Sequence, residues 1–124
     1  MRRRLVFGAS GYIGSHLVPY LLAQGLQVRA TSRNIEVLED RGWDGAVLAA
    51  ADALRPETLD EDLRDIDITY YLVHSMAAGK EFPQLDAVAA QNFADAAGRQ
   101  GVKRIVYLGG LGPEAANSAH LRSR

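Results

Sequence analysis

The sequence contains no cysteine, which excludes disulfide bonds and every metal or redox site built on thiolates. Histidine is scarce too: His16, His74 and His120 are far apart in the chain, and their spacing is not that of metal ligands. We therefore expect no metal site. A chain without cysteine is also typical of the reducing cytoplasm, where we expect this protein to work.

The chain has no excess of charge of either sign. It has 14 Lys and Arg residues against 15 Asp and Glu residues, so its formal net charge is −1. Proteins that bind nucleic acid or anionic membranes through electrostatics carry a basic excess. The composition therefore predicts neither partner and favours a small-molecule ligand.

Long hydrophobic runs are also missing. After the basic start MRRR, the first apolar stretch covers only residues 5–7 before a glycine interrupts it, too short for a signal peptide or a membrane span. The chain has 124 residues, of which 48% are hydrophobic. We therefore expect one globular domain over residues 1–124 with a core of its own.

What is present is an alternation of short apolar runs and longer segments of helical period, the α/β pattern. Strands are expected at residues 5–7, 27–30, 46–50, 66–74 and 104–108. Helices are expected at residues 13–22, with a distortion at 15–19 caused by Pro19, at 35–41, from Pro56 onward, and at 85–97. Right-handed crossovers then predict a Rossmann-type doubly wound parallel sheet, strand order 3-2-1-4-5, in an α/β/α sandwich.

The segment GASGYIG joins the first expected strand to the first expected helix. Gly8, Gly11 and Gly14 permit a tight turn, the approach of a pyrophosphate to the backbone, and close packing of helix on strand. The helix N-terminus adds unpaired amides, at residues 10–13, and a positive dipole end. The pattern predicts a dinucleotide site between the first and fourth strands. Tight-turn glycines in another doubly wound fold are the alternative.

The residues after the second strand indicate which dinucleotide is bound. An NAD site has an acid there, whereas this chain has Thr31, Ser32 and Arg33, and no acid before Glu36. Arg33 can bind a 2′-phosphate, with the hydroxyl groups of Ser32 and Ser10 beside it. We therefore expect NADP (NADPH) rather than NAD. An ordinary solvated surface arginine is the alternative.

Asp52 follows the third expected strand in the segment AAADAL. Its carboxylate can accept a hydrogen bond from the amino group of an adenine. An acid after a strand is equally often an ordinary turn residue, so both interpretations stay open.

These features, with Arg33-Asn34 and the stretch YYLVHSM, resemble the atypical short-chain dehydrogenase/reductase proteins with NmrA-like, NAD(P)H-binding domains. The resemblance covers almost the whole chain. With HLRSR, it is similar to a bacterial group in which such a domain precedes a domain of unknown function. It implies hydride transfer between NADPH and a small carbonyl or ene substrate. A dinucleotide-sensing regulator or a structural protein is the alternative.

The resemblance also implies roles for single residues. The amides of Tyr12 and Ile13 would bind the pyrophosphate, and Leu72, Val73 and His74 would line the ribose and nicotinamide. For His74, a structural histidine held by hydrogen bonds is the alternative.

The catalytic residues depart from the family pattern. Short-chain dehydrogenases commonly use a serine just after the fifth strand, where this chain has Gly109 and Gly110. Their tyrosine and lysine, with three residues between them, correspond in spacing to His120 and Arg124. Histidine can act as a general acid, so we expect strong NADPH binding with slow or absent carbonyl reduction. A solvated helix start is the alternative.

The segment HLRSR ends the chain without a sixth strand or the C-terminal segment that the resemblance places after it. We therefore expect residues 1–124 to be the N-terminal part of a longer protein, whose oligomeric state stays open.

Overall fold

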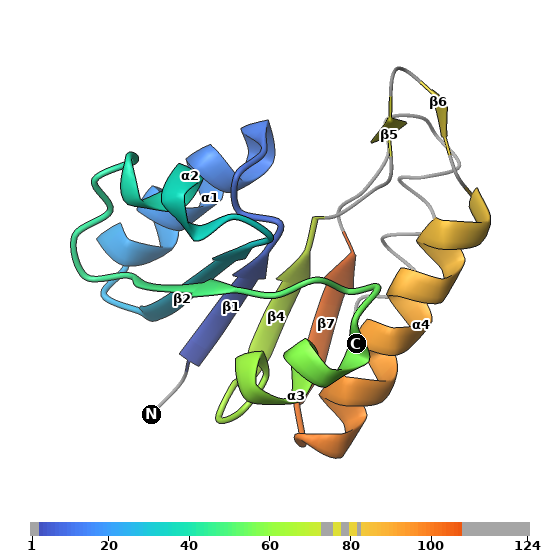
Figure 1. The fold of residues 1–124 in the computed structure, drawn as a ribbon. Helices are drawn as coiled ribbons and strands as arrows, with labels where there is room; N and C mark the ends of the chain where they lie inside the picture. The colour runs from blue at the N-terminus through green and yellow to red at the C-terminus, as the bar shows by residue number, and fades with distance from the viewer. Residues whose placement is uncertain (1–2, 73–75, 78–79, 82, 108–124) are drawn as a thin grey trace.

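The computed structural model describes residues 3–72, 76–77, 80–81 and 83–107. Its main sheet consists of five parallel strands: β1 (Arg3–Phe7), β2 (Gln27–Ser32), β3 (Val47–Ala50), β4 (Ile68–Tyr71) and β7 (Arg104–Tyr107). Their order β3-β2-β1-β4-β7 (Figure 1) confirms the predicted order 3-2-1-4-5. The strand order reverses between β1 and β4, so a ligand crevice is expected at the carboxyl ends of these two strands.

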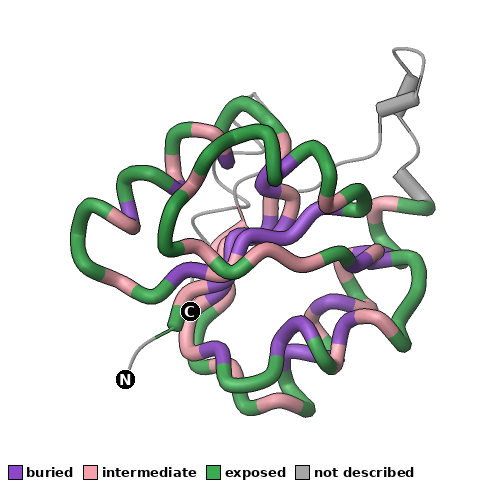
Figure 2. Tube along the Cα trace, turned by 60° about the vertical axis from the view of Figure 1, so that its left-hand side comes forward, coloured by how far each residue is buried: buried purple, intermediate pink, exposed green. Residues whose placement is uncertain are grey.

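Helices cover both faces of the sheet and complete the three predicted layers (Figure 1). α1 (Tyr12–Ala23) and α2 (Ile35–Glu39) pack on one face. α3 (Leu59–Asp62) and α4 (Pro83–Arg99) pack on the other face. A 3-10 turn at Pro56–Thr58 directly precedes α3. The buried positions run through the middle of the molecule, and the exposed positions lie on the outer turns (Figure 2).

Each face of the sheet has its own hydrophobic core. The core under α1 and α2 contains Val6, Ala9, Val18, Leu21, Val28, Ala30 and Leu38. The core under α3 and α4 includes Leu5, Phe7, Leu59, Leu63, Tyr71, Phe93 and Ala96. Successive residues of β1 therefore enter opposite cores, and this explains why the run LVF is apolar throughout.

Helix α1 continues past Pro19, which confirms the predicted helix. The proline has no N–H to donate to the carbonyl of Ser15, but it lies on the exposed side. Val18 and Leu21 are buried against the sheet on the other side, and their packing holds the helix together.

The fourth strand and the segment after it differ from the prediction. β4 is shorter than 66–74 because the Ile66 amide still donates to the Leu63 carbonyl (3.3 Å) in the turn after α3. Residues 73–74 lie outside the described part. Within the expected loop, β5 (Met76–Ala77) and β6 (Lys80–Glu81) pair as a two-residue antiparallel hairpin.

Candidate functional site

The glycine-rich loop between β1 and α1 is fastened to the end of β2. The amides of Gly8 and Ala9 both donate to the carbonyl of Thr31, each at 2.9 Å. At Gly8 the backbone has a φ of +88°, a conformation that favours glycine. The predicted turn is therefore formed, and it lies beside the carboxyl end of the neighbouring strand.

Two later glycines have different tasks in this loop. Gly14 is buried, and a Cβ there would lie 2.4 Å from the Ala9 carbonyl oxygen, so it lets α1 rest directly on the loop. Gly11 is exposed and extended, and a Cβ there would come no nearer than 3.9 Å to the Gly8 oxygen. Gly11 therefore leaves open space in front of the loop rather than close contact within it.

The N-terminus of α1 opens into that space. No side chain caps the helix at Gly11, and the first turn contains no acid. Tyr12 and Ile13 are exposed. The amides of this turn and the positive end of the helix dipole are thus available to an anion, as the sequence predicted.

The end of β2 carries the predicted arginine on a well-formed turn. The Ser32 hydroxyl accepts from the Asn34 amide and donates to the Asn34 carbonyl, both at 3.1 Å. The Asn34 side chain in turn accepts from the Glu36 amide and caps α2. Ser32 is almost fully buried, so its main visible role is to shape this turn.

Arg33 itself is exposed at the tip of the turn. Within the described segments, it has neither an ion pair nor a hydrogen bond. Its guanidinium is therefore available to an external anion at the same edge of the sheet as the glycine-rich loop.

Sequence reasoning missed Arg41. Its Nη2 donates a 2.8 Å hydrogen bond to the Ser10 carbonyl, and its guanidinium lies over the Trp43 ring, 5.8 Å from the centroid. Nothing in the local sequence could have indicated this contact, because the two partners are 31 positions apart and meet only in the folded chain.

Asp52 has the turn role that the sequence left open. Its Oδ1 accepts from the Leu54 amide at 2.9 Å, while its own amide donates to the Thr58 hydroxyl. The Asn92 side chain on α4 donates to the Ala53 carbonyl at 2.8 Å and holds this loop against the helix. The Asp52 side chain remains half-exposed, so the turn role does not exclude a ligand contact.

The end of β4 lies where the strand order reverses, the place at which a ligand crevice is expected. The Leu72 amide donates to the Phe7 carbonyl at 2.9 Å, which brings the chain after β4 beside the end of β1. Val73 and His74, predicted to line the nicotinamide, lie outside the described residues, and so do His120 and Arg124. Their predicted roles are therefore not tested by the structure.

Four aromatic side chains pack beneath the carboxyl ends of the strands on the α4 side. Phe7, Tyr71 and Phe93 contact one another, and Tyr107 meets Tyr71 edge-on. Burial raises the pKa of Tyr71 well above its ordinary value, and the neighbouring Tyr107, Asp86 and Asp52 act in the same direction. The Tyr71 hydroxyl therefore stays protonated, and the cluster packs at the ends of β1, β4 and β7.

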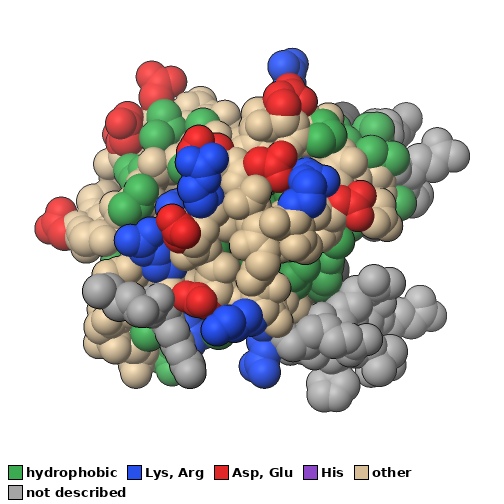
Figure 3. Space-filling view, turned by 90° about the horizontal axis from the view of Figure 1, so that it is seen from below, with side chains coloured by type: hydrophobic (Ala, Val, Ile, Leu, Met, Phe, Trp, Pro, Cys, Tyr) green, Lys and Arg blue, Asp and Glu red, His purple; other side chains and the backbone are tan. Residues whose placement is uncertain are grey.

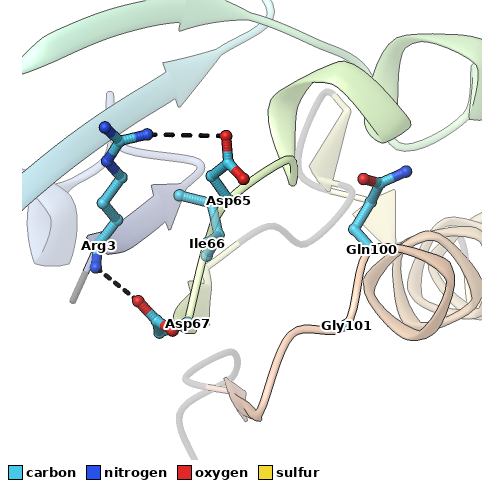
Figure 4. A pocket seen from close by; sticks show the side chains of 6 residues that line it. All are labelled: Arg3, Asp65, Ile66, Asp67, Gln100 and Gly101. Atoms are coloured by element: carbon cyan, nitrogen blue, oxygen red, sulfur yellow. Dashed lines mark hydrogen bonds and ion pairs between the residues drawn. The ribbon is translucent and has the colours of Figure 1, made fainter. Parts of the chain in front are cut away.

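The opposite edge of the sheet has a different character. Seen from below (Figure 3), it presents interspersed basic and acidic side chains. An open hollow of about 400 Å³ lies there, lined by Arg3, Asp65, Ile66, Asp67, Gln100 and Gly101 (Figure 4). The Arg3 side chain contacts Asp65 and its backbone amide donates to Asp67, so these charges are already paired.

Neither a metal site nor a membrane-spanning helix is found in the described segments. They contain no group of His, Asp and Glu side chains that could hold a metal ion. None of their helices is long and apolar enough to cross a membrane.

Comparison with known proteins identifies the kind of site. The family described as NAD(P)H-binding matches residues 8–123. The chain is 34% identical over 115 residues to cinnamoyl-CoA reductase 2 of Arabidopsis thaliana, covering 86% of this chain and 35% of the relative. It is 28% identical over 109 residues to 4-hydroxy-2-methyl-3-oxo-4-farnesyl-3,4-dihydroquinoline-1-oxide ketoreductase of Stigmatella aurantiaca, covering 86% and 33%. The chain thus spans about a third of the length of these relatives.

The fold also matches solved structures. A Rossmann-fold NAD(P)-binding family protein from Shigella flexneri has a TM-score of 0.74 and 20% identity, with 98% of this chain and 62% of that chain covered. At this identity the likeness concerns the fold alone.

Proposed function

We propose that this chain, which belongs to the NAD(P)H-binding family, is a Rossmann domain of the extended short-chain dehydrogenase/reductase type and binds NADPH in preference to NADH. The observation that carries the preference is Arg33, exposed and without a partner among the described residues, at the end of β2. A guanidinium there favours the 2′-phosphate of NADPH, whereas a carboxylate would favour the free ribose hydroxyl of NADH.

The glycine-rich loop fits the pyrophosphate. The space kept open by Gly11 lies in front of the uncapped N-terminus of α1, where the amides of Tyr12 and Ile13 can donate to phosphate oxygens. A Cβ on residue 11 would project into this space. The space at Gly11 thus supports a pyrophosphate in front of the N-terminus of α1.

The remaining predicted contacts follow the edge of the sheet. Asp52 would accept from the adenine amino group with the carboxylate oxygen that its turn does not use. Leu72, with Val73 and His74 after it, would line the ribose and nicotinamide at the end of β4. Ser10, in the glycine-rich loop, and Ser32 would lie nearest the 2′-phosphate.

We further propose that the protein is an oxidoreductase acting on a small carbonyl or ene substrate. Two similar proteins are named as a ketoreductase and a cinnamoyl-CoA reductase, which supports reduction as the reaction class. A nicotinamide cofactor, when bound, would supply the hydride. The chain has to donate a proton to the carbonyl oxygen, and by sequence spacing this role falls to His120, with Arg124 beside it.

A second function, dinucleotide sensing without turnover, is favoured by one observation. Gly109 and Gly110 stand at the place where short-chain dehydrogenases commonly have a serine hydroxyl. Binding without reduction would then be the whole activity of this domain.

The proposal is tested by titrating the full chain with NADPH and with NADH. One desolvated arginine–phosphate pair contributes about 1.5–3 kcal/mol, so NADPH should bind roughly tenfold or more tightly. Arg33→Ala should remove most of this preference while the affinity for NADH stays unchanged. Arg64→Ala is the matched control, because Arg64 pairs with Glu61 on the surface of α3. Tighter binding of NADH to the parent protein, or an unchanged preference in Arg33→Ala, would contradict the assignment.

A further inference from the structure

We propose that Arg41 is a second determinant of cofactor choice, which binds the same 2′-phosphate as Arg33 from the side of the glycine-rich loop. The inference rests on the proposed NADPH site and adds a residue that sequence spacing did not identify. It is carried by the position of the Arg41 side chain on the glycine-rich loop.

Arg41 is brought to the loop by the end of α2. The helix ends at Glu39, the Arg41 amide still donates to the Leu38 carbonyl at 3.0 Å, and the chain turns at Gly42 with a φ of +68°. This turn directs the Arg41 side chain back toward Ser10. Arg33 and Arg41 thus lie at the two ends of the segment that contains α2, and both belong to the surroundings of the loop.

The guanidinium of Arg41 is held in place before any ligand arrives. Its Nη2 donates to the Ser10 carbonyl at 2.8 Å, and its plane is supported by the Trp43 ring. A side chain that is already ordered loses less conformational entropy when it binds a ligand. Arg41 therefore needs little rearrangement to take part in binding.

Holding the loop does not use up the donors of this side chain. A guanidinium carries several N–H groups, and the Ser10 carbonyl takes a hydrogen bond from Nη2. In the described part of the chain no carboxylate forms an ion pair with Arg41, although Glu39, Asp40 and Asp44 are close to it in sequence. The remaining donors are available to an anion beside Ser10.

A phosphate monoester matches what two arginines offer. It carries more than one negative charge at neutral pH and has three oxygens that accept hydrogen bonds, so a single guanidinium satisfies only part of it. The Thr31 carbonyl joins the loop to the end of β2, which carries Arg33, and the Arg41 side chain is joined to the same loop through the Ser10 carbonyl. A ribose hydroxyl at the same place would gain little from either charge.

The test compares the binding of 2′,5′-ADP, which carries the 2′-phosphate, with the binding of 5′-ADP, which does not. Neither nucleotide contains the nicotinamide. Trp43 is the sole tryptophan, so its fluorescence reports on the ring under Arg41. We expect 2′,5′-ADP to change this fluorescence, and calorimetry to give the two affinities. Arg41→Ala should weaken 2′,5′-ADP roughly tenfold and 5′-ADP less than about twofold. Arg41→Met, which keeps a long unbranched side chain but removes the guanidinium, should behave in the same way.

The outcomes separate this inference from the proposed function. Equal weakening of both nucleotides in Arg41→Ala and Arg41→Met would show that Arg41 only holds the loop, and would overturn the inference. A loss of preference in Arg33→Ala but not in either Arg41 variant would also overturn it, while NADPH selection by Arg33 would stand. Failure of the parent protein to bind NADPH would overturn the proposed function itself. Thermal unfolding of each variant confirms that it is folded.

Discussion

Thr31 and Asp62 are joined by a buried hydrogen bond, in which the threonine hydroxyl donates to Asp62 Oδ1 at 2.8 Å. The other carboxylate oxygen of Asp62 is buried without a hydrogen-bond partner among the described residues. The carbonyl of the same threonine holds the glycine-rich loop. A titratable group therefore lies under the backbone that carries the candidate site.

This arrangement predicts an unusual pH dependence of stability. Burial raises the pKa of Asp62 from 3.8 to about 6, while the hydrogen bond from Thr31 and the charge of Arg29 oppose the shift. Between these values the folded protein binds more protons than the unfolded chain, so this group's contribution is complete below about pH 4 and is lost as the pH rises through about 6. The loss amounts to at most about 3 kcal/mol of unfolding free energy.

The measurement is urea unfolding of the parent protein and Asp62→Asn between about pH 4 and about pH 8. The asparagine keeps an acceptor for Thr31 and does not titrate. Relative to Asp62→Asn, the parent protein should lose stability as the pH rises. Parallel curves for the two proteins would contradict the prediction.

Asp60, in the same helix, provides a control, because its contribution to stability should change with pH in the opposite direction to that of Asp62. A hydrogen bond from the Arg99 side chain lowers the pKa of Asp60, and Gln100 adds a smaller effect in the same direction. Its contribution is therefore present above the ordinary pKa of a carboxyl group and is lost as the pH falls. The advantage of the parent over Asp60→Asn should shrink toward acid pH, opposite to the trend for Asp62.

The two glycines at the start of α1 should separate folding from binding. Gly14→Ala places a methyl group 2.4 Å from the Ala9 carbonyl oxygen, and we expect it to lower the free energy of unfolding by about 1–3 kcal/mol. Gly11→Val adds its side chain to open space on extended backbone, so stability should change by less than about 0.5 kcal/mol. NADPH binding should be lost in Gly11→Val. Full NADPH affinity in a folded Gly11→Val protein would remove the pyrophosphate site from the loop.

The sheet order and the loop could be predicted because their signals are local. Glycines at fixed spacing after an apolar run, and alternating strand and helix patterns, fix the topology without any knowledge of distant contacts. The start of β4 could not be predicted, because the apolar run already begins at Ile66 while the backbone there is still in a turn. Arg41 was missed for a related reason: its partner Ser10 lies in another element.

The acidic residues in and directly after α3 are another case in which the sequence could not predict a contact between two elements. The segment LDEDLRD contains several exposed carboxylates, and nothing in its pattern marks Asp62 as the buried one. Burial follows from the position of Thr31 on β2, whose hydroxyl meets Asp62 across the layer. Sequence reasoning identifies residue types and spacings, whereas this pair is set by the packing of a short helix on the sheet.

The proposed catalytic role is tested by NADPH oxidation with a panel of aldehydes and ketones. We expect slow turnover or none, because a serine hydroxyl is missing at Gly109 and Gly110. Any activity should fall by about 100-fold or more in His120→Ala, the range expected for loss of a general acid. Brisk turnover that survives both His120→Ala and Arg124→Ala would exclude this role.

The strand at the centre of the sheet precedes both of its neighbours in the chain, so the ribosome makes it before either of them. β1 pairs with β2 on one side and with β4 on the other. Until Tyr71 has been synthesised, one edge of β1 therefore has no neighbour, and its backbone groups and the apolar run LVF stay open to other nascent chains. The glycine-rich loop, which continues from β1, is thus not supported on both sides until β4 has been made.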